Sequence, residues 1–230
     1  MEHRKEGYGF LRGEGLEIGA FHQPAPLPEG CQVTYCDAFT KEEAIELFPE
    51  LNFDDLVTVD RVCDLDIERL SPFASNSVDF VILNHVIEHV ANPVRVIHEV
   101  FRVTKRRGRV VVSAPDKEFT FDKDRNLTPF EHLLSDYRND VTEVSDDHYI
   151  DFLMGVYPGM RELDESELAK HVAHVKKRRE HAHVWDSDSF KEFLVNCFEH
   201  IGIAPVCLFE STGQDNQMEY FSVWEKQETI

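Results

Sequence analysis

The stretch Ser77-Val-Asp-Phe-Val-Ile-Leu-Asn84 decides the fold. Its almost unbroken apolar run is typical of a strand that is buried on both faces of a sheet. After Asn92-Pro93, apolar residues recur at helical spacing, which predicts a helix with proline in its first turn. The run Val110-Val-Val predicts a second buried strand. A strand, a helix and a strand in this order indicate a parallel sheet with a right-handed crossover.

Ligands bind to sheets of this kind beyond the carboxyl ends of the strands. Asn84 and His85 follow the first of these two strands, and Asp116 follows the second. We therefore expect these three side chains at the functional edge of the sheet. The basic run 105–107 is predicted to lie in the last turn of the helix, where it complements the helix dipole, and Gly108 is predicted to end that helix.

Composition excludes several classes of protein. The chain has 230 residues and a formal net charge of −20, which disfavours binding to nucleic acids and to anionic membrane surfaces. No apolar run approaches the length that spans a bilayer, and the first residues do not look like a signal peptide. The five cysteines form no CxxC pair, so we expect reduced thiols and a cytoplasmic location.

The segment from Gly15 to Asp116 resembles the core of class I S-adenosylmethionine-dependent methyltransferases, and it is most similar to the ubiquinone and menaquinone biosynthesis type. The residues that carry the resemblance are Phe80–Val90, the following Asn-Pro pair and Val103–Asp116. The resemblance implies an α/β fold with a Rossmann-like, seven-stranded, mostly parallel sheet whose last strand is antiparallel. It also implies that the cofactor is S-adenosylmethionine.

The first cofactor loop of that family has an acidic residue and then glycines spaced two apart. Glu17 and Gly19 match the first two positions, but Phe21 and Gln23 stand where the next two glycines would be. Two interpretations remain open. Either the three prolines at 24, 26 and 28 stiffen a different loop that still holds the cofactor, or cofactor binding is weakened.

Two further carboxylates have roles that the resemblance implies. Asp37 would accept hydrogen bonds from the ribose hydroxyls, although it could instead be a turn residue. Asp64 would accept from the adenine amino group, with Asp60 and Asp66 as competitors for that role. The full set of implied cofactor contacts is Glu17, Gly19, Ala20, Asp37, Asp64, Leu65 and Asn84.

Residues 115–180 are longer than a minimal core of this family requires, although the whole chain, 1–230, is predicted to be a single domain. Helical patterns are expected over 127–137, 147–157 and 164–179. We interpret the segment as a helical cap over the functional edge that determines substrate specificity. It could instead mediate oligomerisation, which leaves a homodimer open.

Methyl transfer to a hydroxyl is helped by a general base, and His85 is the first candidate because it follows a strand at the functional edge. A supporting structural role for His85 remains open. Asp116 and His183 are the other catalytic candidates. The pair His181-x-His183 could hold a divalent metal together with Asp116 or Asp122, but a hydrogen-bonded polar pocket explains the same residues, so no metal ligands are assigned.

The sequence therefore predicts a cytoplasmic methyltransferase that uses S-adenosylmethionine. The predicted acceptor is a small polar molecule, with a sugar or glycan intermediate and O-methylation favoured. Two alternatives are a non-catalytic interaction module with the same fold and a metal-dependent hydrolase that uses the histidines of the cap.

Overall fold

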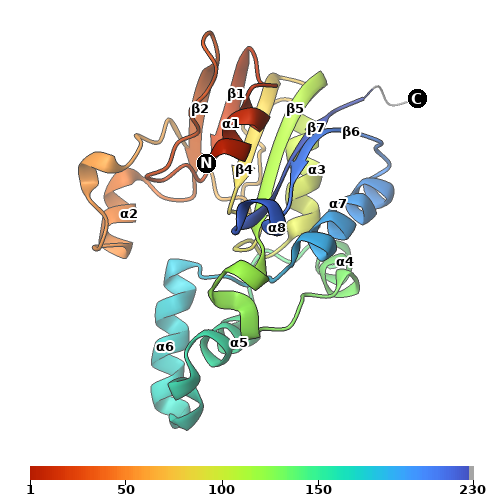
Figure 1. Cartoon of the computed structure of the whole chain (residues 1–230). Helices are drawn as coiled ribbons and strands as arrows, with labels where there is room; N and C mark the ends of the chain where they lie inside the picture. The colour runs from red at the N-terminus through yellow and green to blue at the C-terminus, as the bar shows by residue number, and fades with distance from the viewer. Residues whose placement is uncertain (228–230) are drawn as a thin grey trace.

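The structure is a computed structural model that describes residues 1–227. A seven-stranded sheet with the order β3-β2-β1-β4-β5-β7-β6 forms its centre (Figure 1). Its strands are β1 (Glu14–Ile18), β2 (Gln32–Asp37), β3 (Arg61–Val62), β4 (Val78–Asn84), β5 (Thr104–Pro115), β6 (Val206–Ser211) and β7 (Glu219–Glu225). Strands β1 to β5 pair in parallel, and β7 is antiparallel to both β5 and β6. The predicted α/β fold and its antiparallel last strand are confirmed.

One helix precedes β1, and the others occupy the connections between the strands. They are α1 (Glu2–Tyr8), α2 (Lys41–Leu47), α3 (Pro93–Val103), α4 (Phe130–Arg138), α5 (Asp146–Val156), α6 (Glu165–Arg178), α7 (Ser187–Ile201) and α8 (Gly213–Asn216). Four short 3-10 helices are η1 (Phe53–Asp55), η2 (Lys117–Phe119), η3 (Phe121–Asp124) and η4 (Pro158–Glu162). Within residues 1–227, no helix combines the length and the apolar character that crossing a membrane requires.

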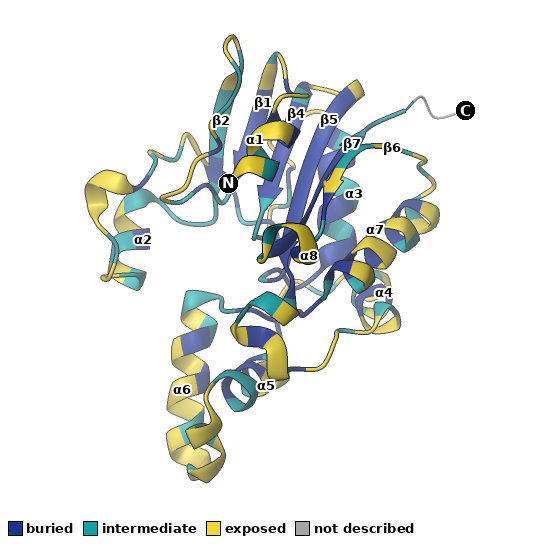
Figure 2. Cartoon of the chain, in the orientation of Figure 1, coloured by how far each residue is buried: buried dark blue, intermediate teal, exposed yellow. Residues whose placement is uncertain are grey.

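Strand β4 is buried on both faces, as its apolar run predicts. Val81 and Leu83 belong to the main core, which α3 and α7 cover. Phe80 and Ile82 belong to a second cluster on the opposite face, where Tyr8 of α1 packs. Figure 2 shows the central strands as the most buried part of the molecule. The sheet edge that follows β4 is therefore held rigidly from both sides.

Helix α3 begins as predicted but ends earlier. The Asn92 side chain accepts from the backbone N–H of Arg95, and Pro93 is the first helical residue. The helix ends at Val103 because the Thr104 hydroxyl donates to the Val100 carbonyl and the chain turns into β5. The prediction that residues 105–107 lie in the helix is wrong, since they belong to β5.

Two other connections are short. Strand β3 contains only Arg61–Val62, and before it the Val57 N–H donates to the Phe21 carbonyl in the loop after β1. The connection between β6 and β7 contains helix α8, which begins with a capping box formed by Thr212 and Asp215.

The insertion between β5 and α7 contains helices α4, α5 and α6, close to the three predicted segments. Helices α5 and α6 pack on each other through an apolar cluster that includes Tyr149, Phe152 and Val172. In Figure 1 they lie beyond the end of β5, on the side of the carboxyl ends of the parallel strands. Helix α4 instead lies beside α3, where the Asn92 side chain donates to the Asp136 carbonyl.

Candidate functional site

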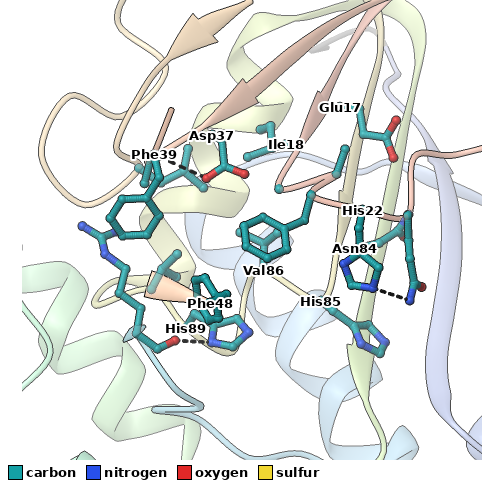
Figure 3. A pocket seen from close by; sticks show the side chains of 18 of the residues that line it. Glu17, Ile18, His22, Asp37, Phe39, Phe48, Asn84, His85, Val86 and His89 are labelled. Atoms are coloured by element: carbon teal, nitrogen blue, oxygen red, sulfur yellow. Dashed lines mark hydrogen bonds between the residues drawn. The ribbon is translucent and has the colours of Figure 1, made fainter. Parts of the chain in front are cut away.

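A cavity of about 430 Å³ opens at the carboxyl ends of β1, β2 and β4 (Figure 3). The loops after these strands supply most of its wall, at residues 17–23, 37–39 and 84–86. Residues 178–180, at the end of α6, close it from the insertion. The cavity therefore lies at the functional edge that the sheet topology predicts.

The structure brings together most of the residues to which the family resemblance assigns cofactor roles. Those that line the cavity are Glu17, Gly19, Ala20, Asp37, Leu65 and Asn84. Asp64 is not among the lining residues. Both of its carboxylate oxygens bind the guanidinium of Arg179, and one of them also accepts from the Asp66 N–H. Asp64 thus binds a residue of the insertion, Arg179.

The loop after β1 takes a tight course without the two missing glycines. Gly19 has a φ of +69°, and a Cβ atom there would lie 2.5 Å from Val86 Cγ2. Phe21 adopts a φ of +52°, a left-handed conformation that is uncommon for such a residue. Its ring packs edge-on against Phe48, with centroids 5.0 Å apart. The Ala25 N–H donates to Glu17 Oε1 at 2.8 Å, which ties the far end of the loop to β1.

Burial raises the pKa values of two carboxyl groups in the cavity wall, those of Glu17 and Asp37. Glu17 is only 3% exposed, and burial raises its pKa to about 7. Within the described chain, its Oε2 atom is buried and has no hydrogen-bond partner. Burial also raises the pKa of Asp37, whose Oδ1 accepts from the Phe39 N–H. Both side chains retain capacity to accept hydrogen bonds from a ligand.

Asn84 and His85 stand at the end of β4. The Asn84 amide donates to the Tyr8 hydroxyl and accepts from the Ser113 hydroxyl, so the protein fixes its orientation. His85 has a φ of +51°, and its Nε2 lies 2.8 Å from Glu219 Oε2. The imidazole of His85 is therefore held at the cavity wall by a carboxylate from β7.

Glu219 gathers several donors although it is completely buried. The Arg4 guanidinium donates to both of its oxygens at 2.6 Å, and His3 Nε2 lies 2.7 Å from Oε1. Burial alone would raise the pKa of Glu219, but the hydrogen bonds from Arg4 and His85 outweigh it and hold the pKa well below its usual range. Glu219 is therefore a carboxylate at neutral pH.

Sequence reasoning missed this network entirely. Helix α1, which carries His3 and Arg4, was not expected, and no spacing in the sequence links residue 219 to residue 85. The network joins α1, the end of β4 and the start of β7, which come together only in the folded sheet. The one available signal in the sequence was Glu219 itself, an acid directly before the apolar run of a strand.

Two catalytic candidates lie outside the cavity wall. Asp116 Oδ2 accepts from both the N–H and the hydroxyl of Ser187, and Oδ1 accepts from the Glu118 N–H. Asp116 thus joins the end of β5 to the start of α7. His183 is 1% exposed, and its Nε2 lies 3.0 Å from the Val90 carbonyl oxygen. Of the three candidates, only His85 lines the cavity.

Comparison with known proteins identifies the type of domain. Residues 13–112 match a family model described as a methyltransferase domain, which spans β1 to most of β5. This part of the chain is therefore a methyltransferase domain. The cofactor of the enzyme is accordingly S-adenosylmethionine. No curated protein matches the chain. The finer resemblance to the ubiquinone and menaquinone type stays a prediction.

Solved structures share the fold of this methyltransferase at low sequence identity. One is the complex of the Haloferax volcanii Trm112 methyltransferase activator with a methyltransferase (11% identity, TM-score 0.51, 98% of this chain and 89% of that chain). Another is geranyl diphosphate methyltransferase with S-adenosylmethionine (12%, 0.50, 98% and 84%). A third, from Rhodobacter sphaeroides, is described as a Zn-dependent alcohol dehydrogenase (16%, 0.53, 97% and 89%). At these identities the likeness shows the fold alone.

The donor set of the cavity fits this cofactor. S-adenosylmethionine presents two ribose hydroxyls, an ammonium group and a sulfonium charge, all of which favour carboxylate partners. The free oxygens of Glu17 and Asp37 offer such partners. Apolar atoms of Phe39, Leu65 and Val86 provide surfaces against which a flat ring can pack.

Proposed function

We propose that this enzyme transfers the methyl group of S-adenosylmethionine to a hydroxyl oxygen of a small polar acceptor, with sugars and glycan intermediates as the first class to test. The observation that carries the proposal is the hydrogen bond between His85 and Glu219 in the cavity wall. A methyl acceptor that is a hydroxyl must lose a proton, and a histidine oriented by a carboxylate is suited to take it.

The residues around the cavity would share the work of holding the cofactor. Asp37 would accept from the ribose hydroxyls, and Glu17 would accept from the charged end of the molecule. The Gly19-Ala20 backbone would pass close beneath it, because Gly19 has no side chain. Leu65 would contact the adenine ring. Asp64 would act indirectly, by holding Arg179 at the cavity edge.

The cofactor supplies an electrophilic methyl group when bound, so the protein has to position the acceptor and remove its proton. Glu219 is an acceptor only, so the proton on His85 lies on Nε2 and the lone pair lies on Nδ1. No partner for Nδ1 is found among residues 1–227. Nδ1 would therefore take the proton of the acceptor hydroxyl, and Glu219 would stabilise the resulting imidazolium.

The nature of the acceptor is inferred from the rest of the wall. His22, Gln23, Arg178 and Glu180 add hydrogen-bonding groups to the cavity. Such a set suits a molecule with several hydroxyls better than an apolar one. Since Arg178 and Glu180 come from the insertion, the insertion would contribute to the choice of acceptor.

The cofactor assignment is tested by calorimetric titration of the protein with S-adenosylhomocysteine. Asp37→Ala should weaken binding at least tenfold, because it removes a carboxylate from the cavity wall. Asp54→Ala is the matched control, since Asp54 is exposed, carries the same charge and does not line the cavity. Equal affinity of wild type and Asp37→Ala would overturn the assignment. Absence of binding by folded wild type would favour a non-catalytic interaction module.

The base assignment is tested by methyl transfer from labelled cofactor to a panel of sugars and other polyols. With an accepted substrate, His85→Gln should lower kcat by about 100-fold or more at neutral pH. The loss should shrink as pH rises, because hydroxide replaces the base. Binding of S-adenosylhomocysteine should stay within a few fold of wild type. A variant with unchanged kcat across the pH range would contradict the role of His85.

A further inference from the structure

Glu88 lies in the loop between β4 and α3, and it is an unusual buried acid. Its side chain is 1% exposed, and neither carboxylate oxygen has a hydrogen-bond partner among residues 1–227. Burial raises the pKa of Glu88 to about 7. A buried carboxylate without donors is unfavourable unless a cation or a proton compensates it. A cation bound beside Glu88 would supply this compensation.

Two imidazoles face this carboxylate from different segments. His89 Nε2 lies 3.7 Å from Glu88 Oε1, and His181 Nε2 lies 3.9 Å from the same oxygen. One ligand atom from each of the three residues falls within 4.8 Å of the other two. His181 comes from the extended segment after α6, which is tied to the loop because the N–H groups of Ala182 and His183 both donate to the Glu88 carbonyl.

Hydrogen bonds on the far side of each ring fix which nitrogen is free. His89 Nδ1 contacts the carbonyl oxygen of Arg179, and a carbonyl can only accept, so Nδ1 carries the proton. His181 Nδ1 lies 2.6 Å from Asp122 Oδ2, and the other Asp122 oxygen accepts from Arg125. The lone pairs of both Nε2 atoms are therefore available on the side of Glu88.

We propose that Glu88, His89 and His181 bind a divalent transition-metal ion such as zinc, manganese or iron(II). Two imidazoles and one carboxylate are a common ligand set for such ions and leave coordination positions open. Ligand atoms at about 2.1 Å from one ion lie roughly 3 to 3.4 Å apart, so the two separations from Glu88 Oε1 need to contract by less than about 1 Å. The ligand atoms of the two imidazoles lie within 4.8 Å of each other, so they need to approach by at most about 1.8 Å. Asp122 and the Arg179 carbonyl are the outer partners that metal-bound histidines require.

The three proposed ligands lie close to the cavity, so a bound ion could take part in catalysis. His89 also lines the cavity, so an ion bound here would stand at the wall of the cavity (Figure 3). A divalent cation with open positions can bind an acceptor oxygen and favour loss of its proton. This role rests on the proposed methyl transfer to a hydroxyl, whereas the binding of the ion does not.

A second histidine cluster serves as the internal comparison. His132, His148 and His183 also place three ring nitrogens within 4.8 Å of one another. However, His132 Nε2 and His148 Nε2 already satisfy each other at 3.1 Å, and Asp136 Oδ2 lies 3.3 Å from His132 Nε2. Among the buried side-chain atoms of this cluster, His183 Nδ1 has no partner within the described chain, but it is a ring nitrogen, so this cluster lacks the unpaired carboxylate that defines the first.

The test is calorimetric titration of chelator-treated full-length protein with Zn²⁺ and Mn²⁺, and optical spectroscopy with Co²⁺ as a probe. Wild type should bind one equivalent, and Glu88→Gln and His181→Gln should each weaken binding at least 100-fold. His148→Gln is the matched control, and it should bind like wild type. Asp122→Asn should cost about 10- to 100-fold, because it loosens His181 without removing a ligand.

Absence of binding by wild type would overturn the proposal, and so would a loss that follows His148→Gln but not Glu88→Gln. Thermal unfolding of each variant identifies any that fails to fold, and two independent ligand variants keep the test decisive. Titration of the same samples with S-adenosylhomocysteine separates the two proposals. Metal binding without cofactor binding would leave the ion site standing, and the reverse would leave the methyltransferase assignment standing.

Discussion

Gly19 and Gly30 make a controlled pair for testing how the first cofactor loop is built. Both adopt left-handed backbone conformations, with φ values of +69° and +87°. A Cβ at Gly19 would lie 2.5 Å from Val86 Cγ2, whereas a Cβ at Gly30 would meet nothing within 4 Å. Alanine at either position therefore strains the backbone, but only alanine at 19 collides with a neighbour.

The expected magnitudes follow from this difference. Left-handed backbone costs a residue with a Cβ about 1–2 kcal/mol, so Gly30→Ala should lower the free energy of unfolding by that amount. At Gly19 the displaced Val86 side chain adds about 0.5–1.5 kcal/mol, which brings the total to about 1.5–3.5 kcal/mol. Since Val86 lines the cavity, its displacement should also raise the Kd for S-adenosylhomocysteine about tenfold.

Urea denaturation measures the stability difference, and calorimetric titration with S-adenosylhomocysteine measures the affinity. Gly30→Ala should bind like wild type. The double variant Gly19→Ala/Val86→Ala should recover most of the affinity, because the second change removes the colliding methyl group. Equal stability losses in Gly19→Ala and Gly30→Ala, with equal affinities, would refute the reasoning that close approach to Val86 shapes the loop.

Three further predictions concern buried and paired carboxylates. The folded-state pKa of Glu17 is raised to about 7 by burial, so its contribution to stability is full below its unfolded value near 4.5 and is lost as pH rises through 7. In urea titrations, Glu17→Gln should therefore raise the free energy of unfolding by roughly 3 kcal/mol at pH 8 and leave it nearly unchanged at pH 4. An equal effect at the two pH values would contradict the raised pKa of Glu17. Asp116→Ala should lower the free energy of unfolding by about 2–3 kcal/mol, because the hydrogen bonds to Ser187 and Glu118 are lost, while kcat of the folded enzyme stays close to wild type. A large fall in kcat without a fall in stability would return Asp116 to the set of catalytic candidates. Asp64→Asn should speed dissociation of S-adenosylhomocysteine in stopped-flow measurements, because Arg179 loses its ionic partner at the cavity edge. An unchanged dissociation rate would show that this ion pair does not help to retain the ligand in the cavity.

The parts of the fold that sequence predicts well are those that local chemistry specifies. Strand β4 has an unbroken apolar run, and Asn92-Pro93 begins α3 by a cap that involves only its nearest neighbours. The capping box that begins α2 is equally local, because it involves only Thr40 and Glu43. By contrast, the short pairing of β3 depends on a contact between Val57 and the loop after β1, which no local pattern reveals.

The site shows the same division. The strand ends bring His85, Asp37 and Glu17 to one cavity, because parallel strands finish at one edge. Asp116 also lies after its strand as predicted, but its carboxylate turns towards Ser187. Whether a polar side chain at the correct edge faces a ligand or a neighbouring helix depends on packing that the sequence pattern does not contain.

The bond between His85 and Glu219 joins positions that are 134 residues apart in the chain. During synthesis on the ribosome, the segment up to β5 would emerge long before β7, so His85 would be in place before the carboxylate that binds it. The hydrogen bond would form only when β7 inserts between β5 and β6, the strands that it pairs with. Completion of this part of the cavity wall would therefore wait for the last strand of the sheet.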